Sequence, residues 1–411
     1  MIRVLFISNR LPPEGLGGAE AVALSIAEGC SRAGATVAVM GIGGSPVWEG
    51  HRPAARGDEI QASKLSWYRL NPTRLSAIQG GEVVPVLKRI AAHIVDLMPT
   101  YRRSVAESVI TDFQPDLVVT NNVRGLGMGT VVACARSNAK WIHIPHDVQL
   151  LTPSGLWYLD GRPSTLWHRR QVRFSYQRWM RRLFKQVDYV FAATEFILEA
   201  HLARGFFPAA GAEVLRLPSV QSGATPRVRR RAKPPAPGDV ESPLHVAMVG
   251  RLTDHKGIAW ALSAICRVRT PIVVDVCGTG DQAEEMRLLA ESAPPSVTVN
   301  LHGHLAPTQR DQVLAAADLL VVPSLAQECF PLVIEEATDL GLPSIASRSG
   351  GIPELVRSEW LFAPGDSADF LRVLGEFDRL RPEATHIEQS PVPQQQFVDR
   401  LLARGELLIK S

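Results

Sequence analysis

The sequence predicts an α/β protein of two domains, each built on a parallel sheet with covering helices. A chain of 411 residues is long enough for two or three domains with separate hydrophobic cores. In both halves, short apolar runs alternate with segments of helical periodicity, as in strand–helix–strand units. Residues 221–242 are rich in Pro, Ala and Arg without an apolar period, which predicts a linker. We therefore expect an N-terminal domain over residues 1–220 and a C-terminal domain over residues 243–390.

The composition is that of a soluble globular enzyme, with 45% hydrophobic and 21% charged residues. The five cysteines are odd in number and contain no C-x-x-C pair, which argues against a disulfide framework and a zinc site. The first residues, MIRVLFISNR, predict a strand rather than a signal peptide. Since no run of about 18 apolar residues occurs, we expect no membrane span and a cytoplasmic location.

The net charge of +3 is distributed unevenly, with +8 over residues 1–220 and −8 over residues 243–411. The segment from Trp167 to Lys185 has seven Lys/Arg and no acidic residue. Its expected apolar face consists of Val172, Tyr176, Trp179, Met180 and Leu183. Two interpretations stay open: the helix docks on an anionic membrane surface, or it packs Trp179 and Met180 into the first domain. The basic first half favours the membrane.

The N-terminal domain begins with a strand–helix–strand unit. Residues 4–8 form a buried strand, apolar residues recur at helical spacing from Ala19 to Cys30, and residues 36–40 form the next strand. The connecting loop carries Gly17 and Gly18 directly before the helix, where a backbone without side chains lets a ligand approach closely. The spacing is not G-x-G-x-x-G, so the dinucleotide fingerprint of dehydrogenases is absent.

Further along, the strands expected over residues 116–120 and 141–145 lead to His146 and Asp147. This is the carboxyl end of a strand, where open α/β sheets bind ligands. A lone histidine is more often structural, as we expect for His143 in the middle of the strand. Other expected elements are helices over residues 83–97 and 129–139, and strands over residues 188–193 and 213–217.

The C-terminal domain opens with a strand over residues 245–249, followed by GRLTDHKG. Arg251 ends the strand and Lys256 begins the next helix, so two cations lie beside a strand end and suit a diphosphate. Two ordinary surface cations are the alternative. Strands over residues 272–276 and 297–301 end in loops with Gly278, and with Gly303 and His304.

The stretch from Pro323 to Gly351 is the most informative. A buried strand over residues 319–322 ends in a loop with Glu328, and a helix begins near Pro331. The free backbone N–H groups of that helix start offer an anion site. At about 100° per residue, Glu336 falls on the stripe of Val333, Ala337 and Leu340, whereas Glu335 falls on the opposite, solvated face.

These motifs closely resemble the signature of family 4 of the retaining glycosyltransferases (glycosyltransferase group 1 type). The matching features are Glu328 and Glu336 seven residues apart in PSxxExF, the following GLPSIASRSGGIPE, and GR followed by KG. The resemblance covers nearly the whole chain and is weakest between residues 45 and 110. It implies the GT-B fold, two Rossmann-like domains that hold a nucleotide-sugar in the cleft between their parallel sheets. It also implies that a terminal helix within residues 391–411 packs back on the N-terminal domain.

The resemblance implies a role for each candidate residue. Arg251 and Lys256 would neutralise the leaving diphosphate, Glu328 would hold sugar hydroxyls, and Glu336 the ribose hydroxyls. His146 would support the sugar near its 6-hydroxyl. The other expected donor-binding residues are Gly17, Gly18, Gly278, Gly303, His304, Phe330, Pro331 and Leu332. Pro331 departs from the family, where glycine is common, and it removes a backbone N–H at the helix start, which leaves the donor sugar open.

The implied reaction is transfer of a sugar, with retention, from a nucleoside diphosphate to an acceptor hydroxyl, in polysaccharide or glycolipid assembly of the bacterial type. We expect no cofactor, no metal because no D-x-D motif lies in a suitable loop, and no nucleic-acid partner. The acceptor is a lipid-linked saccharide if the basic helix meets a membrane. One alternative is a GT-B epimerase or phosphorylase, although we identify no lysine for pyridoxal phosphate. Another is an inactive binding subunit, which the presence of Glu328, Lys256 and Arg251 disfavours.

Overall fold

The computed structural model describes residues 1–11, 17–43, 65–71, 86–158, 170–218, 220, 243–380 and 392–411. The chain forms two compact units. The first unit comprises Met1–Gly155, Pro163–Pro218 and Val392–Ser411, and the second comprises Leu156–Arg162 and Ser219–Pro391. The expected linker over residues 221–242 lies outside the described residues. Within the described ranges, no helix is both long and apolar enough to cross a membrane.

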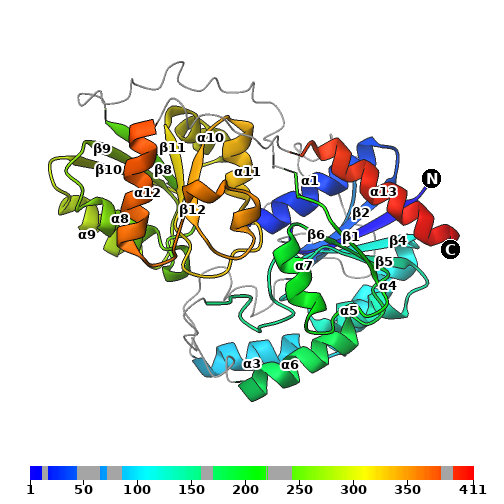
Figure 1. Ribbon diagram of the computed structural model, residues 1–411. Helices are drawn as coiled ribbons and strands as arrows, with labels where there is room; N and C mark the ends of the chain where they lie inside the picture. Colours follow the sequence, from blue (N-terminus) through cyan, green and yellow to red (C-terminus); the bar gives the residue numbers. More distant parts are fainter. Residues whose placement is uncertain are drawn as a thin grey trace. The chain divides into compact units, whose positions relative to one another are not determined.

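The first unit contains a sheet of seven parallel strands (Figure 1). Along the chain these strands are β1 (Arg3–Arg10), β2 (Thr36–Ile42), β3 (Leu65–Leu70), β4 (Leu117–Thr120), β5 (Lys140–His143), β6 (Tyr189–Ala192) and β7 (Gly211–Val214). Their order across the sheet is β3-β2-β1-β4-β5-β6-β7, so β1 lies in the interior, between β2 and β4. Leu5 pairs with Ala38 on one side and Val118 on the other. The interior strands β4 and β6 are buried along their whole length, as expected where both faces of a sheet are covered, whereas the edge strand β7 is exposed or half-buried.

Seven helices are described in the first unit: α1 (Gly18–Arg32), α3 (Val86–Asp96), α4 (Arg103–Phe113), α5 (Met128–Arg136), α6 (Arg170–Leu183), α7 (Glu195–Leu202) and α13 (Gln394–Lys410). The terminal helix α13 packs along α1 (Figure 1). The Phe397 ring lies 5.9 Å from the Phe191 ring, and Arg400 Nε lies 2.7 Å from Glu213 Oε1. The C-terminus of the chain is thus part of the N-terminal unit.

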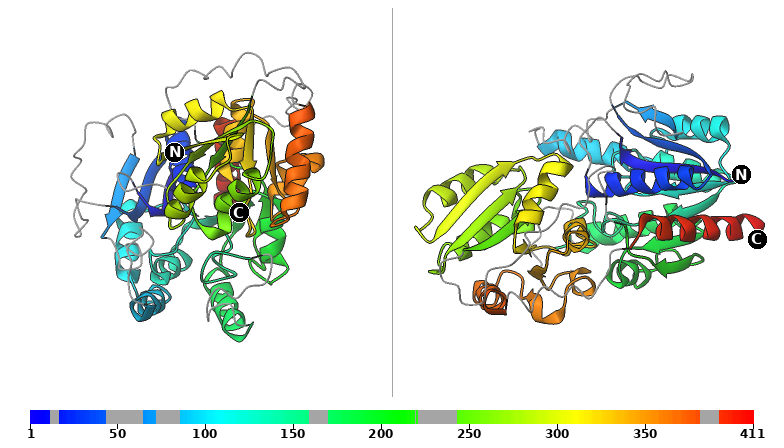
Figure 2. Two further views of the ribbon diagram at one scale, coloured as in Figure 1. Left: turned by 90° about the vertical axis from the view of Figure 1, so that its left-hand side faces the viewer. Right: turned by 90° about the horizontal axis from the view of Figure 1, so that it is seen from above.

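The second unit repeats this architecture with six parallel strands in the order β10-β9-β8-β11-β12-β13. The strands are β8 (Leu244–Val249), β9 (Ile272–Cys277), β10 (Val297–Gly303), β11 (Leu319–Val322), β12 (Ser344–Ser347) and β13 (Leu361–Phe362). The helices are α8 (Ile258–Ile265), α9 (Ala283–Glu291), α10 (Pro307–Ala316), α11 (Leu332–Asp339) and α12 (Ser367–Leu380), with a short 3₁₀ turn η2 (Asp254–Lys256) before α8. The right-hand view of Figure 2 shows the β8, β9 and β10 strands beside one another.

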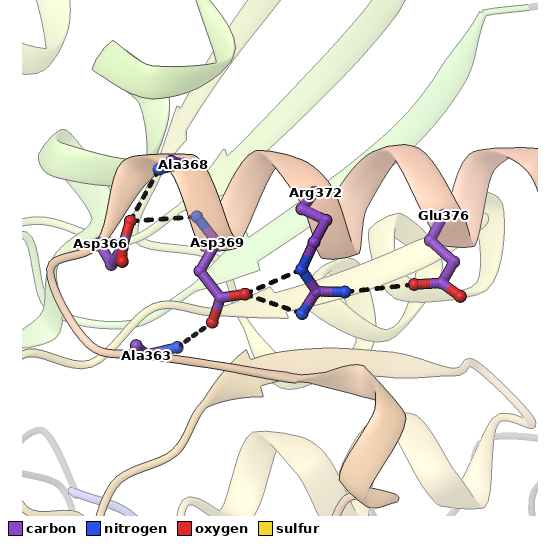
Figure 3. Close-up of polar contacts among 6 residues, drawn as sticks. All are labelled: Ala363, Asp366, Ala368, Asp369, Arg372 and Glu376. Carbon is purple, nitrogen blue, oxygen red and sulfur yellow. Dashed lines mark hydrogen bonds and ion pairs between the residues drawn. The ribbon is translucent and has the colours of Figure 1, made fainter.

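Helix α12 illustrates how side chains set the ends of these elements (Figure 3). The Asp366 carboxylate accepts hydrogen bonds from the backbone N–H groups of Ala368 (2.9 Å) and Asp369 (3.1 Å), which caps the helix start. Asp369 Oδ2 accepts from the Ala363 N–H at 2.7 Å, and its other oxygen pairs with Arg372. The loop from β13 is therefore tied to the helix that it enters.

Both sheets reverse their strand order next to the first strand of the unit, between β1 and β4 and between β8 and β11. At such a switch point the loops at the carboxyl ends diverge and leave room for a ligand. The predicted pair of Rossmann-like parallel-sheet domains is confirmed. Strands β3, β12 and β13 were not predicted, because the apolar residues of β3 and β12 are interrupted by polar ones and β13 has only two residues.

One segment of the predicted domain division is wrong. We assigned all of residues 1–220 to the N-terminal domain, but Leu156–Arg162 belongs to the second unit. Tyr158 forms an antiparallel bridge with Ala326, and the Gln327 N–H donates to the Trp157 carbonyl at 2.8 Å. Backbone pairing of this kind leaves no mark in the composition of the chain.

Candidate functional site

In the first unit, His146 lies just beyond β5. Its imidazole ring is held by Asn121, the residue that follows β4. His146 Nε2 is 2.9 Å from Asn121 Oδ1, and the Asn121 amide nitrogen donates to the Ile7 carbonyl at 3.5 Å. Burial lowers the pKa of His146 to about 4, so the ring is neutral at pH 7. Because the Asn121 oxygen accepts, the proton lies on Nε2, and Nδ1 is left as a hydrogen-bond acceptor.

The next residue, Asp147, has a carboxyl group with a raised pKa. Burial raises the pKa of its carboxyl to about 6, although the Gln149 N–H donates to Oδ1 at 2.7 Å and Arg124 lies nearby. The charge of Glu20, which lies in the first turn of α1, contributes to the rise. A carboxyl that titrates near neutrality beside a strand end is typical of functional sites.

Gly17 and Gly18 lie at the start of α1 and are exposed, as expected for a backbone that a ligand can approach. A Cβ atom on Gly17 would meet the Glu20 carboxylate at 2.6 Å. That carboxylate is the flexible end of a side chain and could move aside, so this contact by itself does not make glycine necessary at position 17.

In the second unit, two predicted site residues form an ion pair. Lys256, at the end of the η2 turn after β8, has its Nζ 2.6 Å from Glu328 Oε1, in the loop after β11. Ser324 Oγ donates to the same oxygen at 2.8 Å. Burial raises the pKa of Glu328, but Lys256 and Ser324 together outweigh burial, so the net pKa is lowered and the carboxylate is ionised. The pair lies at the switch point between β8 and β11.

Two glycines bring these loops together. Gly257 has a φ of +67°, and a Cβ there would lie 2.1 Å from the Pro323 carbonyl oxygen. Gly350 has a φ of +58°, and a Cβ there would lie 2.0 Å from the Glu328 carbonyl oxygen, to which the Gly351 N–H donates at 2.7 Å. The Ser-Gly-Gly motif thus sets the backbone of Glu328, and Gly257 sets the approach of Lys256.

The remaining loops of this edge are joined through backbone. A Cβ on Gly278 would lie 1.8 Å from the Gly250 carbonyl oxygen, and the Gly278 N–H donates to the Gly303 carbonyl at 2.7 Å. Arg251 and His304 are exposed beside these glycines in the sequence. The loops after β8, β9 and β10 thus contact one another through their backbones at the carboxyl edge of the sheet. Arg251 is an exposed cation in the first of these loops.

The predicted faces of α11 are wrong for Glu335, whereas Ala337 is buried as expected. Glu335 is fully buried with Ile334 and Ala337, so the expectation that it is solvated is wrong. The Glu336 side chain is only 11% exposed, and its Oε1 lies 3.1 Å from Arg310 Nη1 of α10. Burial nevertheless raises the pKa of Glu336, and Arg310 opposes the rise. In a helix of eight residues the stripe is too short to define the inward face, which packing against β11 decides.

The start of α11 carries three of the predicted donor-binding residues. Phe330 and Pro331 are buried and Leu332 is half-buried. Pro331 is the residue before the helix, and its carbonyl accepts from the Ile334 N–H at 3.0 Å. The N–H that proline lacks is one that the helix itself would not have used.

Sequence reasoning missed Asn121, Ser324 and Arg310, each of which contacts a predicted site residue. Asn121 directly follows a strand, which is a signal that could have been used. Ser324 and Arg310 carried no such signal in the sequence. The partner of Ser324 lies across a turn, and the partner of Arg310 lies far along the chain. Among the described residues, no group of three or more His, Cys, Asp or Glu side chains is placed to hold a metal ion.

Two protein families match consecutive parts of the chain. Residues 17–218 match the glycosyl transferase 4-like domain, and residues 243–377 match the glycosyl transferases group 1. An uncharacterized 42.6 kDa protein in the cps region of Klebsiella pneumoniae is 23% identical over 366 residues, which are 87% of this chain and 88% of the relative. The putative colanic acid biosynthesis glycosyltransferase WcaL of Salmonella typhimurium is 26% identical over 54% of this chain and 56% of its own length.

The fold is also that of solved structures. HepE of Anabaena, in complex with UDP and glucose, superposes with a TM-score of 0.61 at 17% identity. The alignment covers 100% of this chain and 99% of HepE. This similarity shows the shared two-domain fold.

Proposed function

The chain belongs to the group 1 glycosyltransferases, and we propose that it moves a sugar from a nucleoside diphosphate to an acceptor hydroxyl, with retention and without a metal ion. The observation that carries this proposal is the Lys256–Glu328 pair at the switch point of the second unit. A cation and an ionised carboxylate placed together offer one partner for a phosphate and one for sugar hydroxyls.

Lys256 and Arg251 would stabilise the charge that develops on the leaving diphosphate. Preorganised charge of this kind is often the largest catalytic contribution. An ammonium group has three donors, and Glu328 takes one of them, so Lys256 keeps donors for phosphate oxygens. Both hydrogen bonds described for the Glu328 carboxylate go to Oε1, which leaves Oε2 for a sugar hydroxyl.

The neutral His146 suits a hydroxyl-binding role. Its Nδ1 would accept from the 6-hydroxyl of the sugar, because Nε2 is committed to Asn121. Glu336 would hold the ribose hydroxyls, with Arg310 keeping its carboxylate in place. Gly278, Gly303 and the residues at the start of α11 would face the nucleotide.

We place the reaction in polysaccharide or glycolipid assembly, with a lipid-linked acceptor at the cytoplasmic face of a membrane. The similarity to the colanic acid biosynthesis glycosyltransferase supports the role in polysaccharide assembly. Exposed apolar side chains support the membrane location. Phe174 of α6 is 61% exposed, Ile94 of α3 is 48% exposed, and Met98, just after α3, is 44% exposed. Both helices lie at the lower end of the first unit in Figure 1 and in the left view of Figure 2.

The cations of α6 complete this membrane-facing surface. Arg178, Arg182 and Lys185 are exposed, whereas Met180 is buried and Arg181 donates to the Arg204 carbonyl. Each exposed cation near an anionic bilayer contributes on the order of 1 kcal/mol. Co-sedimentation with anionic and neutral vesicles tests the surface: Arg178/Arg182→Glu should lose anionic binding, and equal, negligible binding of the unmodified protein to both vesicles would refute the idea.

The donor assignment is tested by thermal stabilisation with a set of nucleotide-sugars. A ligand at 100 times its Kd contributes about 2.7 kcal/mol, which is readily detected. Proton NMR of the product then reports the anomeric configuration, and turnover in EDTA reports metal dependence. No stabilisation by any nucleotide-sugar or nucleoside diphosphate would refute the proposed function.

A further inference from the structure

The carboxylate of Asp147, in the loop after β5, has one oxygen that is engaged and one that is not. The Gln149 N–H donates to Oδ1 at 2.7 Å, which closes a turn within the loop and fixes the carboxylate. Oδ2 has no hydrogen bond or ion pair to any residue that the structure describes. The side chain is half-buried, and Oδ2 is accessible to solvent, unlike the buried polar atoms that lack a partner.

Space is left beside this free oxygen. Gly155 has a φ of +68°, which favours glycine, and a Cβ there would lie 3.4 Å from Asp147 Oδ2. The same Cβ would lie 3.5 Å from Arg124 Nη1, which instead donates to the Ser154 carbonyl at 2.7 Å. The chain thus presents Oδ2 between a glycine and a guanidinium group that is already held by backbone.

Asp147 lies close to the switch point of the first unit. The charges that act on its carboxyl are those of Arg124, in the loop after β4, and of Glu20, in the first turn of α1. These two loops are the ones that diverge between β1 and β4. The neighbouring His146 is tied to the same place, because it bonds to Asn121 just beyond β4.

The two carboxylates considered for the reaction differ in proton affinity. Glu328 accepts from Lys256 and Ser324, so its pKa is lowered and it is suited to holding hydroxyl groups as an anion. Burial raises the pKa of Asp147 to about 6, because the Gln149 N–H and Arg124 only partly offset it and Glu20 adds to it. Carboxyl groups whose environments separate their pKa values in this way typically divide charge stabilisation and proton transfer between them.

We propose that Asp147 is the proton acceptor of the transfer reaction, with its Oδ2 taking the proton of the acceptor hydroxyl. The inference rests on the proposed glycosyl transfer. The acceptor oxygen forms a bond to C1 of the sugar with its own electron pair. The bond from C1 to the diphosphate oxygen breaks, and its electron pair leaves with the diphosphate. The hydroxyl proton passes to Oδ2 and is later released to solvent.

Hydrolysis of a nucleotide-sugar tests this step, because water then takes the place of the acceptor. The probe is whichever of UDP-glucose, ADP-glucose and GDP-mannose stabilises the unmodified protein most. Since Asp147 must be ionised, kcat/KM should fall about tenfold per pH unit below about pH 6. Asp147→Asn still accepts from Gln149 but should lower kcat by about 10²-fold or more and remove the fall near pH 6. Asp147→Glu keeps a carboxylate, so the acid-side fall should return.

Two controls separate this role from others. Donor affinity, measured by calorimetry, should be unchanged in Asp147→Asn, and Glu199→Gln, at an exposed position on α7, should change neither affinity nor rate. An unaltered rate and pH profile in Asp147→Asn would overturn the proposal, because the leaving diphosphate then takes the proton. A tenfold loss of donor affinity with kcat unchanged would also overturn it, since Asp147 would then hold the donor. Failure of the unmodified protein to bind any nucleotide-sugar would instead count against glycosyl transfer itself.

Discussion

Replacement of Lys256 by Met separates catalysis from stability. The variant keeps the length of the side chain but removes the cation 2.6 Å from Glu328 Oε1. The exposed fractions of the two side chains are 27% and 15%, so the pair is partly screened by solvent. Loss of a charged hydrogen bond at such a site costs about 1.5–3 kcal/mol in the free energy of unfolding. We expect a value near the lower end of this range.

The pH dependence follows from the lowered pKa of Glu328. A carboxyl with a depressed folded-state pKa contributes stability above its unfolded pKa of about 4.3, and this contribution is lost as pH falls through the folded pKa. The difference in stability between the unmodified protein and Lys256→Met should therefore be largest near pH 7 and shrink below about pH 4. Denaturant unfolding at several pH values measures it.

A double variant provides the control. Lys256→Met with Glu328→Gln removes the uncompensated charge, so it should regain part of the stability that Lys256→Met lost. Turnover should not recover, because the diphosphate has lost its cation: kcat/KM is expected to fall by about 10²-fold or more, or about 2.7 kcal/mol, in both variants. Unchanged turnover in Lys256→Met with the correct donor would refute the reasoning.

Three further predictions concern other contacts of the site. Asn121→Asp places a carboxylate 2.9 Å from the imidazole of His146 and should raise the pKa of His146 from about 4. The pH profile of kcat/KM should then fall more steeply on its acid side, and a profile like that of the unmodified protein would contradict this. Glu336→Ala should weaken binding of the free nucleoside diphosphate in calorimetry by about tenfold, with Arg310→Ala weakening it less, and equal affinity would exclude the ribose role. Gly257→Ala should reduce activity and stability together, because its Cβ would meet the Pro323 carbonyl; unaltered unfolding would show that the turn adapts.

The sequence by itself determined the elements whose signals are local. Apolar runs located β1, β4, β8, β9 and β11, and the charged and glycine-containing turns after them located Arg251, Lys256 and Glu328. A strand buried on both faces needs a continuous apolar run, and a tight turn needs glycine, so both features are written into neighbouring residues.

Only the tertiary structure decided the pairings between distant segments. The contact of Asn121 with His146, the full burial of Glu335, and the pairing of Trp157 with Gln327 each depend on a partner that sequence spacing does not specify. A short helix has too few apolar residues to define its inward face, and a backbone hydrogen bond is independent of side-chain identity. For these contacts the deciding free energy comes from packing across the fold, which local propensity does not contain.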